Sequence, residues 1–323
     1  MYEADARWQR PGYFPQPEET PQNTINREGR SVRYSVGVYD GSPLGKFEIK
    51  GQDAGRFLDL IYTNLVSTLC VGQASYVMML SDDGLTIDDG VVMRLGPHRW
   101  LLSTFTGHAD AMNQHMDMLR QTEVLDWQLH LTTVTSQWAN ATLCGPMARD
   151  VLSALGTDID LDATAFPFMH VRDGQVAGIA ARVVRASYTG ELSLEINVAP
   201  RDLEVLWLCI MKAGAAFDIA SVGSEANHVL RIEKEFLSLG HEIDGTIDLG
   251  MGWIVSKKKT GYWGKRSITL RRAGSMRPRE LIGLLPDDPA QNLVEGAPLT
   301  PGGRKSAGEG FVTACVWSVV HAR

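Results

Sequence analysis

The stretch SYTGELSLEI, residues 187–196, alternates polar and hydrophobic positions with the period of a β-strand. Leu194 and Ile196 lie on one predicted face, which leaves Glu191 and Glu195 on the other. A solvated strand face is the ordinary explanation, because a one-sided antiparallel sheet has a polar side. The alternative is that a carboxylate binds a ligand, and the strand alone does not distinguish the two.

Elsewhere the hydrophobic periodicity predicts strands and helices in irregular order. Residues 46–65 predict a short strand, a Gly-Gln-Asp turn and an amphipathic helix whose apolar side includes Phe57 and Ile61. Residues 75–105 predict three strands joined by Asp-Gly and Gly-Pro turns. Further helices are expected at residues 107–122, 201–214 and 224–237. This irregular succession favours an α+β fold over a wound parallel sheet.

The composition is that of an ordinary globular protein, since 323 residues with 44% hydrophobic content can form two or three domains. A net charge of −7 without an extended basic run argues against nucleic acid as the main partner. No stretch approaches the ~18 apolar residues of a membrane span. The scattered cysteines form no CxxC pair, which argues against a disulfide framework and for a reducing compartment. The sequence therefore predicts a cytoplasmic protein that acts on a small molecule or another protein.

Several familiar motifs are missing. No GxGxxG follows a predicted strand, so we expect any flavin to be bound by a partner chain. The segment GYWGKRS differs from a phosphate-binding loop, because Arg266 stands where Ser or Thr should follow the lysine. His108 and His115 lie seven residues apart with no acidic neighbour at metal-ligand spacing, and no GxSxG is present. We therefore expect no metal site.

Six segments, taken together, resemble one family. They occur in the order and spacing found in the folate-dependent aminomethyltransferases, the glycine-cleavage T-protein family. Within it, the forms VLRIEKEF and SKKK…GKRS and the start RWQRPGYF make the chain most similar to the carboxy-terminal region of the alpha subunits of heterotetrameric sarcosine oxidases. The resemblance runs from about residue 5 to the end. The segments are SVGVYDGSPLGKFEIKGQDAGRFLDLIYTN, LTIDDGVVMRL, WANATLCGPMARDVL, SYTGELSLEI, SEANHVLRIEK and GWIVSKKKTGYWGKRS.

The resemblance implies an α+β fold of three domains in a ring around a central channel, with ferredoxin-like or antiparallel sheet domains. The first domain is expected at residues 31–45 and 131–250, interrupted in sequence by a second domain at residues 46–130. Residues 1–30 are rich in Pro, Glu, Gln and Arg and are expected to form an extended arm. Residues 251–323 are expected to form a linker and an incomplete carboxy-terminal β-barrel.

The resemblance assigns a ligand role to Glu195, which matches the pterin-binding glutamate of the family. An ionised carboxylate only accepts hydrogen bonds, so it can accept two parallel bonds from the N–H groups of a reduced pterin. Tyr188 and Arg231 match residues of the same folate pocket, and an exposed helix cation is the alternative for Arg231. Glu191 matches an acidic position of the YTGE turn, and we expect it to hold that turn.

The segment TIDDGVV poses a second choice. On its own, Asp-Asp-Gly is typical of a hairpin turn. The resemblance instead places Asp89 at the catalytic aspartate near the reactive folate nitrogens, where a carboxylate can stabilise a cationic iminium, accept a proton or orient the amine. Asp88 is expected to shape the loop beside the cofactor, and Tyr76 matches an aromatic position of the pocket, with core packing as the alternative. The run Lys257–Lys259 would meet the glutamyl tail of folate or a partner, unless it is simply solvated.

Two departures from the family pattern change the expectations. The segment TIDLGMGW is about two residues shorter than its counterpart, which leaves the loop before Trp253 undefined. The sequence also lacks the nucleotide-binding part of the alpha subunits and ends at FVTACVWSVVHAR, inside the expected barrel. We expect a partner to complete this barrel, because its edge strands would otherwise be exposed.

Together these features predict a tetrahydrofolate-dependent aminomethyltransferase-type subunit. A flavoprotein partner would oxidise an N-methyl amine such as sarcosine, and folate held by this chain would capture the iminium carbon as 5,10-methylenetetrahydrofolate. The alternative is a folate-binding assembly or regulatory protein without turnover, and a third possibility is a structural subunit that binds nothing. Asp89 favours the enzyme, whereas the lack of a flavin site favours the alternative.

Overall fold

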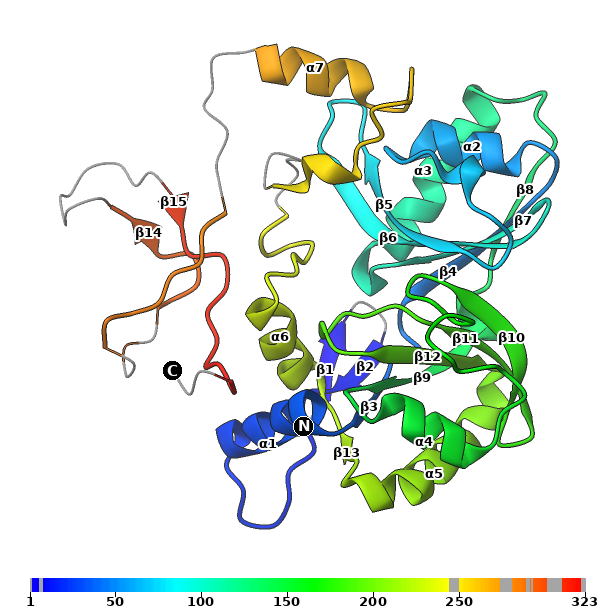
Figure 1. Cartoon of the computed structure of the whole chain (residues 1–323). Helices are drawn as coiled ribbons and strands as arrows, with labels where there is room; N and C mark the ends of the chain where they lie inside the picture. Colours follow the sequence, from blue (N-terminus) through cyan, green and yellow to red (C-terminus); the bar gives the residue numbers. More distant parts are fainter. Residues whose placement is uncertain are drawn as a thin grey trace.

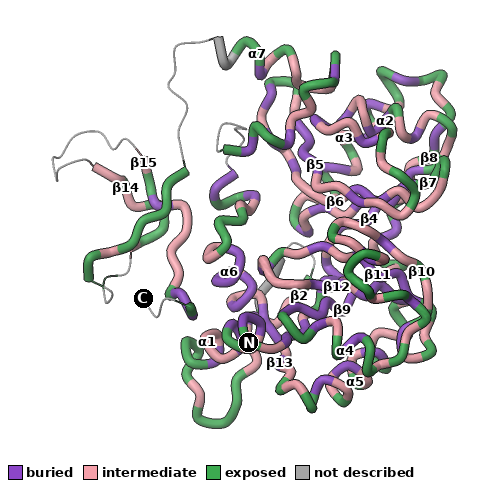
Figure 2. Tube along the Cα trace, in the orientation of Figure 1, coloured by how far each residue is buried: buried purple, intermediate pink, exposed green. Residues whose placement is uncertain are grey.

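The computed structural model describes residues 2–5, 8–243, 250–273, 281–288, 291, 293–300 and 310–320. Two sheets face each other, and helices cover the outer face of each (Figure 1). The carboxy-terminal segment lies beside these layers and is mostly exposed or half-buried (Figure 2). This arrangement of helices and largely antiparallel sheets confirms the predicted α+β class.

The first sheet, here called the β6 sheet, has the strand order β5-β6-β7-β4-β8 and is antiparallel throughout. Helices α2 and α3 pack on its outer face, where Phe57 and Ile61 are fully buried as predicted. The bounds are β4 Gly45–Lys50, α2 Ala54–Ile61, β5 Ala74–Leu80, β6 Thr86–Gly96, β7 Arg99–Thr104, α3 Ala109–Thr122 and β8 His130–Thr133.

The Asp-Asp-Gly at residues 88–90 is not a turn but lies in the first half of β6. The hairpin is made by the preceding Asp-Gly pair, where Gly84 has a φ of +77° and Gly84 N–H donates to the Ser81 carbonyl. A β-carbon on Gly90 would lie 2.1 Å from the Ser103 carbonyl oxygen, so glycine permits the close approach of β6 and β7. Asp88 therefore does not shape a loop, because the turn signal that decides the hairpin lies at Gly84.

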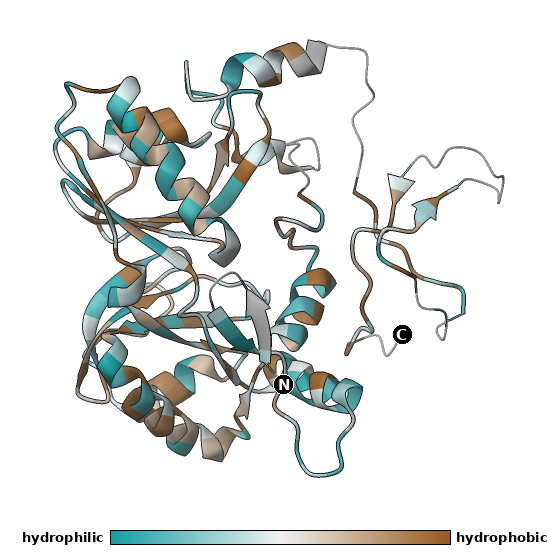
Figure 3. Cartoon of the chain, turned by 180° about the vertical axis from the view of Figure 1, so that it is seen from behind, coloured by the Kyte–Doolittle hydropathy of each residue, from teal (hydrophilic) through white to brown (hydrophobic). Residues whose placement is uncertain are grey.

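The second sheet, here called the β12 sheet, has the order β10-β11-β12-β9-β3-β13 and is antiparallel except for the parallel pair β13 and β3. Its outer face packs on α4 and α5, and Leu194 and Ile196 lie in that core, as the alternation predicted. The covering helices are amphipathic, with hydrophobic and hydrophilic stretches in the same helix (Figure 3). The bounds are β3 Gly37–Asp40, β9 Ala139–Cys144, α4 Ala148–Leu155, β10 Val171–Val176, β11 Ile179–Val184, β12 Ser193–Val198, α5 Leu203–Gly214 and β13 Ala220–Ser221.

The inner faces of the two sheets meet through a hydrophobic cluster. Strand alternation places Asp89 on the same face of β6 as Met93, which belongs to this cluster. Glu195 is the register partner of Val184, which belongs to it from the other sheet. The cluster consists of Ala74, Met93, Leu101, Val134, Val171, Val184 and Ala186. Asp89 and Glu195 are therefore carried by the two surfaces that face each other.

The amino-terminal region differs from the predicted extended arm, because residues 21–34 form helix α1. Thr20 caps this helix by accepting a hydrogen bond from Asn23 N–H, and Pro21 occupies the first turn, where its missing N–H costs nothing. The polar, proline-bearing composition of residues 1–30 predicted an extended arm, and the helix-start signal at Thr20 and Pro21 was overlooked. Helix α1 packs on α6, and strands β1 and β2 precede it. The bounds are β1 Tyr2–Asp5, β2 Trp8–Pro11, α1 Pro21–Tyr34 and α6 Ser224–Glu233.

Beyond residue 250, the described residues form two short helices and one pair of two-residue strands. Those described residues form no closed barrel, which agrees with an incomplete one. The shortened loop before Trp253 falls on residues 244–249, outside the described residues. Among the described residues, no helix has the length and apolar character needed to cross a membrane. The bounds are η6 Met251–Ile254, α7 Lys265–Ala273, β14 Pro298–Leu299 and β15 Gly310–Phe311, and further 3-10 turns are Val66–Thr68, Thr106–His108, Thr135–Gln137, Pro200–Asp202 and Ala215–Phe217.

Candidate functional site

Asp89 and Tyr76 form the part of the candidate site that lies on the β6 sheet. Met78 is the register partner of Asp89 on β5, and Tyr76 lies on the same face two positions earlier. The Tyr76 hydroxyl donates a hydrogen bond to Asp89 Oδ2. Burial raises the pKa of Asp89, while the Tyr76 hydrogen bond and the nearby His108 lower it. Trp253 stacks on Tyr76 with ring centroids 6.3 Å apart and remains 71% exposed.

Asp88 lies on the opposite, helix-covered face of β6. It is buried at 1% exposure, and the Thr104 hydroxyl donates to its Oδ2. Its Oδ1 is buried without a hydrogen-bond partner among the described residues. Burial raises the pKa of Asp88 well above its ordinary value, and the charge of Asp89 adds to this. Burial thus favours the neutral form of Asp88, and its side chain lies behind the sheet rather than facing the other sheet.

Lys46 joins the two sheets at the candidate site. Register pairs place Tyr76, Val91, Ser103 and Lys46 in one row across the inner face of the β6 sheet. The Lys46 ammonium group is buried and donates to the carbonyl oxygens of Ser42 and Leu44, both at 2.9 Å. Burial lowers the pKa of Lys46 to about 8, while Glu195 and Asp40 raise it. Lys46 therefore places an ammonium group, whose charge the two carbonyl oxygens partly stabilise, near the Glu195 carboxylate of the β12 sheet.

Glu195 is half-buried in the middle of β12, on the inner face of its sheet. A row of register pairs joins Val184, Glu195, Thr142 and Tyr39 across four strands. Burial raises the pKa of Glu195 from 4.5 to about 7, and Lys46 lowers it in part. No hydrogen bond or ion pair joins its carboxylate to another described residue. A carboxylate that has lost water without gaining donors is ready to accept hydrogen bonds from a ligand.

Tyr188 and Arg231 contribute to the site from the 187–191 turn and from α6. Arg231 is 1% exposed, and its Nη1 donates to Glu242 Oε2 at 2.6 Å and to the Phe236 carbonyl at 3.1 Å. The guanidinium Nε is buried and has no hydrogen-bond partner among the described residues. Arg231 is thus a buried, paired cation and not the exposed helix cation that was its alternative. Loss of solvation raises the pKa of Tyr188, and Arg231 and Ser238 lower it.

These side chains are close enough to influence each other's charge across the two sheets and α6. The Tyr188 phenol interacts electrostatically with Asp89, Tyr76 and Arg231. Tyr39 interacts with both Tyr188 and Glu195. The structure therefore brings together Asp89, Tyr76, Tyr188, Arg231 and Glu195, with Asp88 behind them. Sequence reasoning missed Lys46, Tyr39, Trp253 and Glu242, for which the residue types alone gave no signal.

Two polar regions near the candidate site are held by contacts within the chain. Glu191 forms ion pairs with Arg33 at 3.0 Å and Lys234 at 3.4 Å, as expected for a residue that holds its turn. In the basic run, Lys259 is buried rather than solvated, and its Nζ donates to the Asn64 carbonyl at 2.6 Å. It borders a surface pocket of about 370 Å³ lined by Arg56, Asp59, Leu60, Leu65, Trp127, Lys258, Lys259, Thr260 and Gly261.

A group of potential metal ligands lies next to Arg231. Among the described residues, His228, His241 and Glu295 place one ligand atom each within 4.8 Å of the others. Arg231 Nη2 lies 3.3 Å from His228 Nδ1. Because arginine can only donate hydrogen bonds, His228 Nδ1 accepts this one from the positively charged guanidinium. Burial, Arg231 and His241 lower the pKa of His228 to about 4. A guanidinium at this position disfavours a second cation beside it.

Two relatives with known names are similar to this chain in sequence. A sarcosine oxidase subunit alpha from Corynebacterium sp. (strain U-96) is 39% identical over 325 residues, which cover 99% of this chain and 33% of that protein. The chain thus spans about one third of the length of that relative. An aminomethyltransferase from Chloroherpeton thalassium (strain ATCC 35110 / GB-78) is 34% identical over 248 residues, which cover 76% of this chain and 67% of that protein.

The fold is also found in a solved structure. The crystal structure of glycine cleavage system aminomethyltransferase T from Bartonella henselae superposes with a TM-score of 0.84 at 24% identity, covering 100% of this chain and 83% of that one. Residues 1–259 match the family described as the GCVT N-terminal domain, and the chain therefore belongs to this family, as its six sequence segments predicted.

Proposed function

We propose that the chain binds tetrahydrofolate between its two sheets and transfers a one-carbon unit to it. The observation that carries the proposal is the convergence of Asp89, Tyr188, Arg231 and Glu195 from separate elements. The names of its relatives, an aminomethyltransferase and a sarcosine oxidase subunit alpha, support the same class of reaction. Tetrahydrofolate, when bound, supplies two nitrogens, one in the pterin ring and one in the adjoining side chain, that capture the carbon as 5,10-methylenetetrahydrofolate.

The donor and acceptor properties of the site fit a reduced pterin. No described residue donates a hydrogen bond to the Glu195 carboxylate, and burial raises its pKa to about 7. A ring with adjacent N–H donors would provide two hydrogen bonds and would favour the ionised form of this carboxylate. Tyr188, 40% exposed, and Trp253, 71% exposed, offer aromatic surface for the flat parts of the ligand. Arg231, held by Glu242, would face its polar groups.

Asp89 is the residue that we assign to the chemistry. Tyr76 donates a hydrogen bond to one of its oxygens, which favours the ionised form of Asp89 against the effect of burial. A fixed carboxylate stabilises a cationic iminium and can accept a proton when an amine nitrogen attacks. The enclosing sheets strengthen this interaction, because a low local dielectric increases the effect of a fixed charge.

We further propose that the carbon derives from oxidative N-demethylation of an N-methyl amine or amino acid such as sarcosine. A partner flavoprotein would oxidise the N-methyl group, and the iminium would reach Asp89 in this chain. The similarity to a sarcosine oxidase subunit alpha supports this origin of the substrate. Confinement between the sheets would prevent loss of the carbon as formaldehyde.

Product partition tests the proposal. The purified chain should be colourless and should not oxidise sarcosine, yet tetrahydrofolate should raise its melting temperature, since a ligand at ~100 times its Kd adds about 2.7 kcal/mol to the folded state. Mixed with its flavoprotein partner and saturating folate, it should shift the product from formaldehyde to 5,10-methylenetetrahydrofolate without changing the rate of amine oxidation. Unchanged formaldehyde release would leave a folate-binding assembly or regulatory protein as the function.

A further inference from the structure

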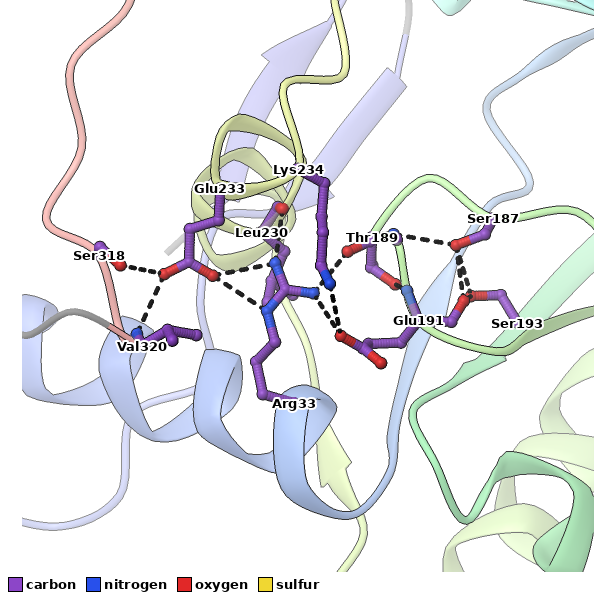
Figure 4. Close-up of polar contacts among 11 residues, drawn as sticks. Arg33, Ser187, Thr189, Glu191, Ser193, Leu230, Glu233, Lys234, Ser318 and Val320 are labelled. Carbon is purple, nitrogen blue, oxygen red and sulfur yellow. Dashed lines mark hydrogen bonds and ion pairs between the residues drawn. The ribbon is translucent and has the colours of Figure 1, made fainter. Parts of the chain in front are cut away.

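Arg33, in the last turn of α1, contacts segments that lie between 156 and 200 residues further along the chain. Its Nη1 donates to the Thr189 carbonyl at 2.6 Å and to Glu191 Oε1 at 3.0 Å. Its Nη2 donates to the Leu230 carbonyl at 2.7 Å, and its Nε donates to Glu233 Oε2 at 3.0 Å (Figure 4). One buried guanidinium therefore joins α1, the 187–191 turn and the end of α6.

These contacts lie next to two residues of the candidate site. Thr189 directly follows Tyr188, and Leu230 directly precedes Arg231. Both contacts are made to main-chain carbonyl oxygens, so Arg33 fixes the backbone of each segment rather than a side chain that can rotate. The separation of Tyr188 and Arg231 is consequently set from one point outside the site.

The 187–191 turn has little freedom to move independently of α6. Ser187 Oγ accepts a hydrogen bond from Gly190 N–H at 3.0 Å and donates to the Glu191 carbonyl at 2.7 Å. Gly190 has a φ of +79°, and a β-carbon there would lie 2.3 Å from Lys234 Cγ. The ammonium group of Lys234 forms an ion pair with Glu191 at 3.4 Å. The turn is thus packed directly against the residue that follows α6.

Charge pairing around Arg33 explains why an arginine suits this position. The guanidinium has five donors in a rigid plane, whereas a lysine ammonium cannot reach Glu191, Glu233 and the two carbonyls together. The second oxygen of Glu233 is held as well, because it accepts from Ser318 Oγ at 2.6 Å and from Val320 N–H at 3.1 Å. A buried ion pair adds little net stability, but it specifies one arrangement of the segments that it joins.

We propose that Arg33 is a positioning residue of the folate site, which sets the placement of Tyr188 relative to Arg231 through the carbonyl groups of Thr189 and Leu230. This inference rests on the proposed function, because it takes Tyr188 and Arg231 as ligand contacts. Arg33 itself touches no ligand in this scheme.

The test is a double-mutant cycle on tetrahydrofolate affinity, measured by calorimetry on the full chain. Arg33→Lys should weaken binding by about tenfold, since the charge is kept but the two carbonyl contacts cannot both be made. In a Tyr188→Ala background, which removes the aromatic contact, the same change should cost less than about twofold, because a positioning residue acts through the residue that it positions. Arg27→Lys on the same helix is the matched control, since Arg27 pairs with Glu19 away from the turn, and it should leave affinity unchanged.

Glu191→Gln provides a second variant that loosens only the turn and keeps the pair of Arg33 with Glu233. It should weaken binding by about threefold in the parent chain and have no effect in the Tyr188→Ala background. The inference is overturned if Arg33→Lys and Glu191→Gln bind folate as the parent does, or if their losses add in full to that of Tyr188→Ala. If the parent chain itself fails to bind tetrahydrofolate, the proposed function fails first, and the two results are distinct.

Discussion

Asp89 and Glu195, which lie on the facing surfaces of the two sheets, differ in whether the protein supplies their hydrogen-bond donors. On the β6 sheet, Asp89 accepts a hydrogen bond from Tyr76. On the β12 sheet, Glu195 accepts from no described residue, and only the cation of Lys46 offsets its loss of water. Satisfied carboxylates are held in place before a ligand arrives, whereas an unsatisfied one gains its partners from the ligand. The comparison thus supports the proposal that Asp89 takes part in the chemistry and Glu195 in binding.

Asp89→Asn tests the chemical half of this comparison and should have the largest effect. The amide keeps the shape but removes the charge that stabilises a cationic iminium, so the rate of methylene transfer should fall by roughly 100-fold. Folate affinity should stay within a few-fold of the parent. Single-turnover kinetics and calorimetry on the same preparation separate the two quantities. A loss of affinity as large as the loss of rate would make Asp89 a binding residue.

Glu195→Gln tests the binding half. Replacing a carboxylate that accepts two charge-assisted hydrogen bonds should weaken tetrahydrofolate binding by about 2 to 4 kcal/mol, on the order of 30-fold or more. The rate at saturating folate should change less than the affinity. Glu204→Gln, on the outer helix α5, is a control that removes one carboxylate far from the inner faces. Equal affinities of the parent and of Glu195→Gln would contradict the assignment of Glu195.

The pH dependence of binding sharpens the same point. Because the pKa of Glu195 in the free protein is about 7, its carboxylate is protonated at pH 6 and ionised at pH 8. Affinity for a ligand with N–H donors should therefore rise by about tenfold between these values, and Glu195→Gln should remove the rise. Calorimetry in buffers of different ionisation enthalpy would detect the proton released on binding. A flat profile in the parent chain would count against the raised pKa.

Stability of the free chain should show the opposite trend. The pKa of Glu195 is raised on folding from 4.5 to about 7, so the folded chain binds more protons than the unfolded chain between these values. The free energy of unfolding should then fall as pH rises through this window, by up to about 3 kcal/mol from this group. Glu195→Gln should lose that part of the slope in urea titrations. A slope unchanged by the substitution would mean that Glu195 is not the group responsible.

Asp88→Asn should have the smallest effect on function. Asp88 faces the helix-covered side of β6, and burial favours its neutral form, which an amide imitates. Both the rate of transfer and the folate affinity should stay within about threefold of the parent, since no charge of the facing surfaces is removed. A rate loss comparable to that of Asp89→Asn would show that the two aspartates act as a unit.

Local sequence signals determined several features of the protein. The alternation around Leu194 and Ile196 predicted the buried face of β12, and the helix with Phe57 and Ile61 was predicted from its period, because each pattern depends on neighbours along the chain. Resemblance to the T-protein family suggested Asp89 and Glu195. The prediction of an extended arm at residues 1–30 was wrong, although Thr20 and Pro21 carried a helix-start signal.

Only the tertiary structure decided which residues support the candidate site. Lys46 precedes Glu195 by 149 residues in the numbering, and Arg33 reaches the Thr189 carbonyl across 156 residues, so no local pattern could pair them. The raised pKa of Asp88 likewise depends on burial of its side chain by segments that lie elsewhere in the sequence. Charge and burial depend on what surrounds a side chain in space, whereas periodicity records only what adjoins it in the chain.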